Sequence, residues 1–296
     1  MQPTLKQLRY FVALSETLHF GRAAAACNIT QPALSGQIRE LELQLGTRLV
    51  ERTPQGAALT PLGVEVARRS REILAAVGDL MDVVHRGRIL FGRLRLGVIP
   101  TVGPYLVPRL LPRLLERFPA LEPSLRESQT RHLLADLAAG QLDVALLALP
   151  LPTAEAMSIV ELFEDPFVLL VHAGHPYAAR STVHQGDLAG ERLLLLEEGH
   201  CLRDQALSLC RRLGAEEHEG FAAASLATIV QMVAQGYGVT LLPRLCLDAE
   251  LRGRSDLRPI GFAPPVPART LGLVWRPGSP RRSDFVALAQ AIRELL

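Results

Sequence analysis

Cysteine is scarce in this chain, with four residues among 296: Cys27, Cys201, Cys210 and Cys246. Small secreted folds that depend on disulfides carry far more cysteine than this. We therefore expect reduced thiols in a cytoplasmic protein. A zinc site is also disfavoured, because the spacing of Cys201 and Cys210 is too wide and no second Cys/His pair accompanies it.

Long apolar runs are missing as well. The first 20 residues lack a basic segment followed by an apolar one, and no stretch of about 18 uncharged apolar residues occurs. We expect a soluble protein with no signal peptide and no membrane contact, which argues against a secreted solute-binding protein. Walker and dinucleotide-binding glycine motifs are absent, so we expect no cofactor and no metal.

Neither sign of charge dominates, since the formal net charge is +2. Residues 1–90 carry +3 and the other 206 residues carry −1, which has the sign of a DNA-binding N-terminus but is small. Hydrophobic residues make up 48% and charged residues 21%, values typical of globular proteins that exclude a largely disordered chain. The length predicts about two domains.

The first 60 residues have the pattern of a three-helix unit. Apolar residues recur at helical spacing, and the alanines at 23–26 allow a second helix to pack closely. Thr30 suits the N-cap of a third helix, with Pro32 in its first turn, and Gly46 is placed to end it. The apolar positions are Leu5, Leu8, Phe11 and Val12, then Leu34, Ile38, Leu41 and Leu45.

A small two-stranded wing is predicted after this third helix. Residues 47–52 and 57–60 read as short strands around a Pro/Gly turn. The side chains suited to base edges or phosphates are Gln31, Ser35, Arg39, Arg48 and Arg52. Spacing alone also allows a three-helix packing module with a solvated polar face.

The same residues resemble the N-terminal domain of LysR-type transcriptional regulators. The matching segments are 8–11, 23–24, 31–35, 38–42, 45–46, 49–53 and 59–63. The resemblance implies that residues 30–45 form a recognition helix in the major groove of double-stranded promoter DNA. It implies DNA contacts from Thr30, Gln31, Pro32, Ser35, Gln37 and Arg39, and from Arg52 on the minor-groove side.

Residues 61–88 predict one long helix, because they contain no internal proline. Its apolar residues follow heptad-like spacing: Val66, Ile73, Val77, Leu80 and Val84. This face either packs on its own chain or pairs with a second copy. In the LysR-type family the corresponding helix dimerises, which implies a homodimer and beyond it a homotetramer.

The remaining residues alternate between strand and helix patterns, which predicts an α/β fold with mostly parallel sheets. The resemblance implies two Rossmann-like subdomains, similar to periplasmic binding proteins, with a cleft for a small effector. The predicted domains are a winged helix-turn-helix (1–60), a linker helix (61–90) and a regulatory domain (91–296). Subdomain I is expected at about 91–165 and 267–296, and subdomain II at about 166–266.

The segment around Cys201 carries the most distinctive chemistry. A helix is expected from about Cys201 to Gly214, so Cys201 lies near its N-terminus, where the helix dipole favours a thiolate. His200 and Arg203 would add positive charge, and Asp204 would orient one of them. In a helix, Cys210 lies about 13 Å from Cys201 between Cα atoms. A disulfide needs about 7 Å or less, so its formation requires the helix to unravel. Two buried structural cysteines are the alternative.

Residues 199–206 resemble the redox segment of the peroxide-sensing LysR-type activators, as do 99–106 and 269–280. This resemblance implies that Cys201 reacts with hydrogen peroxide and that Cys210 then forms a disulfide with it. It implies a peroxide pocket lined by Thr101, Thr130, His200 and Arg269. We expect Arg203 and Asp204 to belong to the same pocket. RNA polymerase and a glutaredoxin- or thioredoxin-type reductant are the implied partners. Cys27 and Cys246 are read as small core residues.

Two other functions stay open. A LysR-type regulator responding to a metabolite would leave the cysteines incidental, and a thiol peroxidase would turn over peroxide continuously. The N-terminal unit and the long helix argue against the enzyme, so we expect a regulator.

Overall fold

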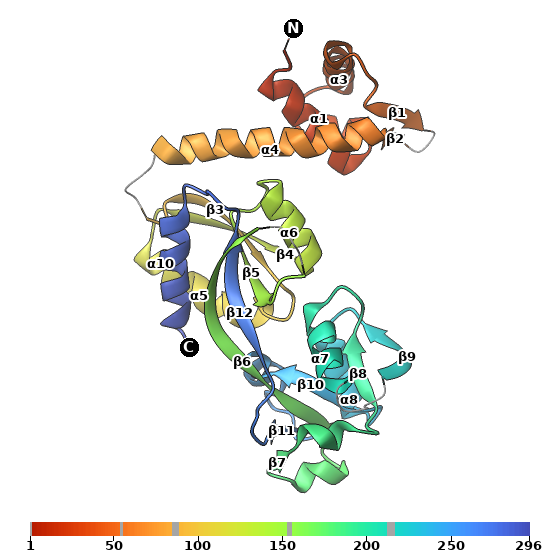
Figure 1. The fold of residues 1–296 in the computed structure, drawn as a ribbon, viewed down its shortest axis with the longest axis vertical. Helices are drawn as coiled ribbons and strands as arrows, with labels where there is room; N and C mark the ends of the chain where they lie inside the picture. Colours follow the sequence, from red (N-terminus) through yellow and green to blue (C-terminus); the bar gives the residue numbers. More distant parts are fainter. Residues whose placement is uncertain (1, 54–55, 85–88, 153–155, 212–216) are drawn as a thin grey trace. The chain divides into compact units, whose positions relative to one another are not determined.

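The structure is a computed structural model that describes residues 2–53, 56–84, 89–152, 156–211 and 217–296. Contacts divide the chain into two units, residues 1–86 with 136–141, and residues 87–135 with 142–296 (Figure 1). In the part of the chain described, no helix combines the length and apolar character needed to cross a membrane.

The N-terminal unit has the predicted order of three helices and a wing. Its elements are α1 (Leu5–Thr17), α2 (Phe20–Ala26), α3 (Gln31–Leu45), β1 (Val50–Thr53), β2 (Gly56–Leu59) and α4 (Pro61–Val84). Thr4 and Gln7 form a capping box at the start of α1, which supplies partners for two helix-end N–H groups. Gly46 ends α3 with φ of +68°, a conformation that favours glycine.

The buried face of this unit differs in detail from the prediction. Leu8, Phe11, Leu34, Ile38 and Leu41 are buried as expected. Leu5 and Leu45 are instead 43% and 38% exposed, while Leu14 is fully buried, and Val12 is only partly buried. Helical periodicity identifies the apolar stripe of a helix but not where the neighbouring helix that covers it ends. Thr30 holds the N-cap position of α3, but its side chain makes no capping hydrogen bond.

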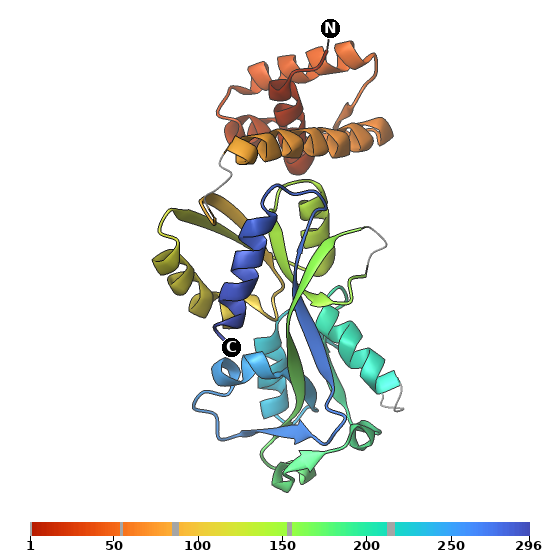
Figure 2. The same cartoon turned by 60° about the vertical axis from the view of Figure 1, so that its left-hand side comes forward.

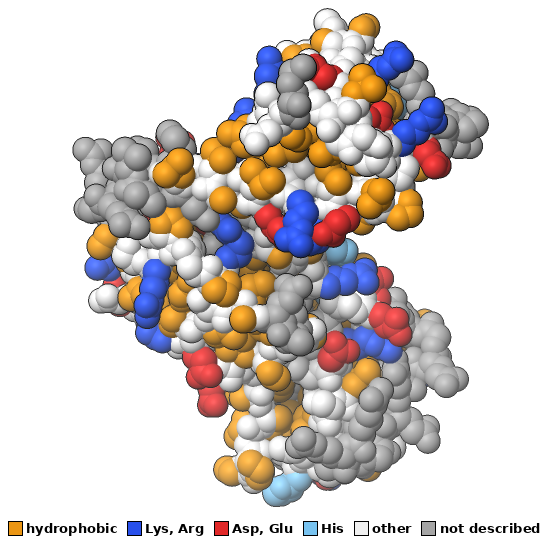
Figure 3. All heavy atoms as spheres, turned by 45° about the horizontal axis from the view of Figure 1, so that its top comes forward, with side chains coloured by type: hydrophobic (Ala, Val, Ile, Leu, Met, Phe, Trp, Pro, Cys, Tyr) orange, Lys and Arg blue, Asp and Glu red, His pale blue; other side chains and the backbone are white. Residues whose placement is uncertain are grey.

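Helix α4 presents only part of its apolar surface to α1. Ala67 and Ser70 are buried within this unit, where α1 packs against α4. Ile73 and Leu80 are 46% and 64% exposed. The side chain of Val84 lies outside the described residues. Hydrophobic side chains gather in patches on the face drawn in Figure 3, with charged groups between them.

The regulatory unit is built on a mixed sheet with the order β4-β3-β5-β12-β6-β11-β7, in which β10 also pairs with β6. The strands are β3 (Gly92–Val98), β4 (Leu121–Glu127), β5 (Val144–Leu149), β6 (Ser158–His172), β7 (Thr182–Val183), β8 (Leu193–Leu196), β9 (Glu217–Ala223), β10 (Thr240–Pro243), β11 (Leu257–Phe262) and β12 (Ala268–Trp275). The main helices are α5 (Gly103–Arg117), α6 (Thr130–Ala138), α7 (Cys201–Arg211), α8 (Leu226–Ala234), α9 (Leu247–Glu250) and α10 (Arg282–Arg293).

Two long strands join the halves of this unit (Figures 1 and 2). β6 and β12 pair antiparallel from Ser158 opposite Trp275 to Pro166 opposite Ala268, and β6 continues onward to pair with β10 and β11. The expectation of mostly parallel sheets is therefore wrong. β12 runs antiparallel to both β5 and β6. The chain leaves the first half along β6 and returns to it along β12, which pairs with β6.

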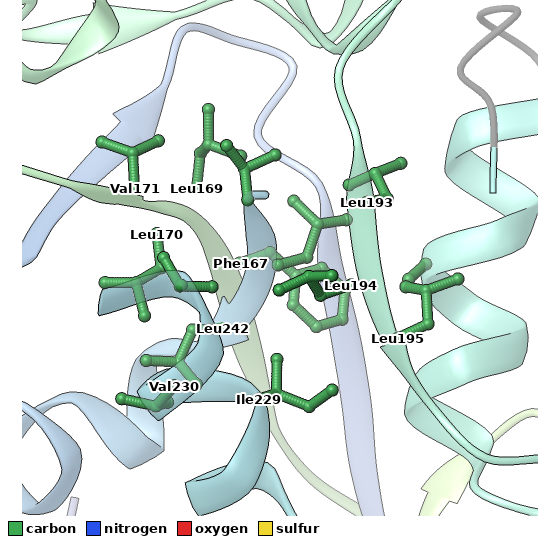
Figure 4. Close-up of a cluster of buried hydrophobic side chains, with 14 of the residues drawn as sticks. Phe167, Leu169, Leu170, Val171, Leu193, Leu194, Leu195, Ile229, Val230 and Leu242 are labelled. Atoms are coloured by element: carbon green, nitrogen blue, oxygen red, sulfur yellow. The ribbon is translucent and has the colours of Figure 1, made fainter. Parts of the chain in front are cut away.

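The half that contains Cys201 has its own apolar core (Figure 4). Leu194 of β8, Ile229 of α8 and Leu242 of β10 are fully buried there. Leu202 and Ala206 of α7 belong to the same cluster, so the inner face of α7 is held by hydrophobic burial. This packing fixes the start of the helix that carries Cys201. The predicted helix end at Gly214 lies outside the described residues.

Candidate functional site

The outer face of α3 carries the residues predicted to contact DNA. Thr30, Gln31, Pro32 and Arg39 are exposed, and Ser35 and Gln37 are partly exposed. Ser35 and Arg39 line a hollow between α3 and the wing, together with Glu42, Thr47, Arg48 and Glu51. Arg52 lies on β1 opposite Ala57, and its side chain is outside the described residues.

Two residues that the sequence analysis did not single out hold the wing in place: Glu42 ties its start to α3, and Thr60 ties its end to Arg48 and to the start of α4. The Glu42 carboxylate accepts hydrogen bonds from the N–H groups of Leu49 and Val50, at 2.8 and 3.1 Å. The Thr60 hydroxyl donates to the Arg48 carbonyl at 2.9 Å and accepts from the Gly63 N–H at 2.9 Å. Both residues lie in segments that match the family pattern, and Thr60 carries the signal of a helix N-cap, since its hydroxyl accepts from an N–H of the first turn of α4.

In the regulatory unit, Cys201 is the first residue of α7 and is partly exposed. Four predicted pocket residues are nearly inaccessible: Thr101, Thr130, His200 and Arg269. His200 directly precedes Cys201, and both Thr130 and Arg269 act on the Cys201 thiol. The structure thus brings these residues together from four separate parts of the chain.

Arg269 is held by a dense set of hydrogen bonds. Its Nε and Nη2 donate to Oδ2 of Asp165 at 3.0 and 2.9 Å. Nη1 donates to the Thr101 hydroxyl at 2.8 Å, and Nη2 donates to the Thr101 carbonyl at 3.1 Å. The side chains of Arg269 and Asp165 are 0% and 2% exposed. The sequence analysis missed Asp165, which faces Arg269 in the register of β6 and β12.

The electrostatics of Cys201 differ from the prediction. Burial raises the pKa of the Cys201 thiol, and this outweighs the opposing effects of Arg269, the Thr130 hydroxyl and the Leu202 N–H. Exposed Asp204 raises that pKa further through its negative charge. The helix N-terminus does act in the expected direction, but desolvation is the larger effect.

The positive charge that acts on Cys201 does not come from His200 and Arg203, the residues that the sequence analysis expected to supply it. Burial lowers the pKa of His200, so it is neutral near pH 7, although Glu197 at 3.8 Å opposes the shift. Arg203 donates to the Leu196 carbonyl at 3.2 Å and is not among the principal groups acting on Cys201. Arg269 is the cation that favours the thiolate.

Several buried oxygen atoms near Cys201 lack hydrogen-bond partners of standard geometry among the described residues. They are Thr130 Oγ1, Gln129 Oε1 and Gln205 Oε1. Gln129 also donates to the Glu198 carbonyl at 3.4 Å and lies against Gly199, where an added Cβ would fall 2.6 Å from Oε1. Gly199 has φ of +93°, so both space and backbone conformation favour glycine here. Unpartnered buried oxygens suit a small hydrogen-bonding molecule.

The other cysteines occupy different settings. Cys246 is fully buried and donates to the Thr101 carbonyl at 3.7 Å, and burial raises its pKa strongly. Cys27 is partly buried, and burial raises its pKa as well. Cys210 lies in the last turn of α7, but its side chain is outside the described residues. No group of three or more metal-ligating side chains occurs within the described ranges.

Comparisons with known proteins define the family. The lysR-family bacterial regulatory helix-turn-helix matches residues 5–64, and the LysR substrate binding domain matches residues 89–296. This chain belongs to the LysR family.

Within that family, the chain is similar over its whole length to peroxide regulators. It is 47% identical to the DNA-binding transcriptional dual regulator OxyR of Escherichia coli K12, over 98% of this chain and 94% of that protein. It is 42% identical to the hydrogen peroxide-inducible genes activator of Haemophilus influenzae, over 98% and 96%. A full-length OxyR variant of Pseudomonas aeruginosa aligns with a TM-score of 0.81 at 36% identity, covering 99% and 98%. A hydrogen-peroxide-bound OxyR mutant of Corynebacterium glutamicum aligns with a TM-score of 0.68 at 37% identity, covering 100% and 94%.

Proposed function

We propose that this chain is a DNA-binding transcription regulator that senses hydrogen peroxide through Cys201. The observation that carries the proposal is Cys201 at the start of α7, beside the Thr130 hydroxyl and the buried cation Arg269. Its full-length similarity to hydrogen peroxide-inducible activators supports the same signal.

The chemistry begins at the Cys201 sulfur. The thiolate attacks one peroxide oxygen, an S–O bond forms and the O–O bond breaks. The sulfur is oxidised to a sulfenic acid, and the departing oxygen leaves as water once it has taken up the thiol proton. The Cys210 thiolate then attacks the sulfenic sulfur, so that an S–S bond forms and the oxygen again leaves as water.

The second step requires α7 to change. Cys201 and Cys210 both lie within α7, and nine residues of helix separate their Cα atoms by about 13 Å. A disulfide tolerates about 7 Å, so the helix must unravel before the bond closes. Oxidation therefore becomes a change of shape in the regulatory domain, which is the switch that we propose.

The switch acts on promoter DNA through a homodimer that assembles further into a homotetramer. The exposed Ile73 and Leu80 of α4 support pairing of that helix, because exposed apolar stripes mark interfaces. RNA polymerase is the proposed partner of the oxidised form. A glutaredoxin- or thioredoxin-type reductant resets the disulfide.

Peptide mapping without reductant tests the proposal. After one equivalent of hydrogen peroxide we expect a Cys201–Cys210 disulfide, with Cys27 and Cys246 still reduced. Cys210→Ser should stop at a sulfenic acid that dimedone traps, whereas Cys27→Ser should behave as the wild type does. If Cys201 and Cys210 stay free while the protein still switches on promoter DNA, the proposal fails. Sustained peroxide turnover with a thiol reductant would instead indicate a peroxidase.

DNA binding by α3 leads to a second prediction. Arg39→Ala should weaken binding to promoter DNA and lower the slope of log K against log salt by about 1, because one phosphate or base contact is lost. Arg117→Ala is the matched control, since it removes an exposed arginine of the regulatory unit that pairs with Glu294. Fluorescence anisotropy over a salt series measures both slopes. Equal slopes for the two variants would remove Arg39 from the DNA interface.

A further inference from the structure

Asp165 is a buried carboxylate whose two oxygens accept hydrogen bonds from two different parts of the fold, strand β12 and a short 3-10 helix. Oδ2 accepts from Nε and Nη2 of Arg269 on β12, and Oδ1 accepts from the Leu245 N–H at 3.0 Å. Leu245 precedes Cys246 in the short 3-10 helix Arg244–Cys246. Asp165 therefore fixes Arg269 relative to both crossing strands and to this helix.

These contacts leave Arg269 with little freedom. A guanidinium has five N–H groups, and hydrogen bonds to Asp165 and Thr101 use four of them. The remaining N–H, on Nη1, has no partner among the described residues. Nη1 is also the atom that donates to the hydroxyl of the predicted pocket residue Thr101.

Stability alone does not account for the pair. Both side chains are almost completely buried, and burying an ion pair costs about as much in desolvation as its attraction returns. Replacing a buried ion pair with apolar side chains of similar volume is often neutral or stabilising. The polar pair is more easily explained by what it holds in place.

We propose that Asp165 is a positioning residue for the peroxide reaction, which holds Arg269 so that its free Nη1 N–H meets the oxygen that leaves. This inference rests on the proposed function. In that step the Cys201 sulfur bonds to one oxygen, the O–O bond breaks, and the other oxygen carries developing negative charge until it takes a proton. A fixed donor at that oxygen stabilises the transition state more than the bound peroxide.

The charges around Cys201 agree with this geometry. Arg269 and Asp204 are the principal charged groups that act on the pKa of Cys201, whereas Asp165 acts on the pKa of Cys246. Arg269 lowers the pKa of both thiols, whereas Asp165 is a principal influence on Cys246 and not on Cys201. Asp165 orients the cation without placing a second negative charge among the main influences on Cys201.

Asp165→Asn is the test, because it keeps the shape of the side chain but has only one acceptor oxygen. Its NH2 group must then face donors, either those of Arg269 or the Leu245 N–H. Asp143→Asn is the matched control, since Asp143 is a buried carboxylate paired with Arg95 and Arg281 elsewhere in this unit. The rate of loss of the Cys201 thiol is measured by mass spectrometry with two probes, hydrogen peroxide and iodoacetamide. Iodoacetamide reports thiolate reactivity but needs no donor for a leaving oxygen.

We expect the ratio of the peroxide rate to the iodoacetamide rate to fall at least tenfold in Asp165→Asn and to stay within twofold in Asp143→Asn. An unchanged ratio, including an equal loss with both probes, would overturn the positioning role. If Asp165→Asn does not fold, the same ratio is read in Asp165→Glu, which moves the carboxylate by one methylene, and an unchanged ratio there has the same meaning. Failure of wild-type Cys201 to react with peroxide would instead overturn the proposed function itself.

Discussion

Replacing Arg269 with glutamine is expected to slow the reaction of Cys201 with hydrogen peroxide by about 100-fold or more. Removing one preorganised donor from a developing oxyanion costs about 10²–10³ in rate. The same change leaves Asp165 buried and unpaired, which should lower the free energy of unfolding by about 3–5 kcal/mol. Stopped-flow thiol loss and denaturant unfolding measure the two effects separately.

Arg203→Gln is the control for this variant, because Arg203 is the cation that the sequence placed beside Cys201. Its guanidinium donates to the Leu196 carbonyl, so we expect less than a threefold change in the peroxide rate.

The double variant Arg269→Gln with Asp165→Asn should recover part of the lost stability but none of the rate, since it removes the unpaired charge without restoring the donor. A larger rate loss in Arg203→Gln than in Arg269→Gln would contradict the electrostatic role given to Arg269.

The N-terminal unit was predictable because its signals are local. Thr30, Gly46 and the apolar spacing of α3 lie within 17 residues of one another, and each follows from backbone preferences that act over a few positions. The exposure of Leu5 and Leu45 was not predictable, because it depends on where neighbouring helices end in space.

Strands of the regulatory unit were harder to predict. β4 and β11 contain Pro123 and Pro259, and a proline inside an apolar segment argues against predicting a strand there, because it cannot donate a ladder hydrogen bond. β4 lies at the edge of its sheet, where a proline is tolerated. Only the second half of β6 is a continuous apolar run in the sequence, because Glu161, Glu164 and Asp165 interrupt its first half. Pairing with β12 extends it to 15 residues, and that pairing is a tertiary contact.

The site shows the same division between local and long-range information. Cys201 at a helix start was visible in the sequence, as was the motif around it. The partner of Arg269 was not visible, since Asp165 is 104 residues away along the chain. The helix dipole at Cys201 was predictable because it is a local property, whereas the burial that outweighs it and raises the pKa depends on the whole fold.

The raised pKa of Cys201 leads to a prediction about pH. Since the thiol pKa lies above its ordinary value of 9.0, the thiolate is the minor form throughout the range from pH 7 to 9. The rate of alkylation by iodoacetamide should therefore keep rising with pH over this whole range, by about tenfold from pH 7 to 8, without a plateau. His200 is neutral here because burial lowers its pKa, so no inflection near pH 6.5 is expected. A plateau below pH 8 would contradict the assignment.

The same shifts set the sign of the alkaline dependence of stability. Burial raises the pKa values of Cys201, Cys246 and Tyr105 in the folded protein, so the unfolded chain loses these protons first. Their contribution to stability is complete below the unfolded pKa values and is lost as pH rises through the folded ones. The free energy of unfolding should thus fall above about pH 9. Because the raised pKa limits the thiolate fraction of Cys201 near pH 7, a donor at the leaving oxygen is the means by which we expect its reaction with peroxide to be accelerated there. Arg269, held by Asp165 and Thr101, is placed to supply that donor.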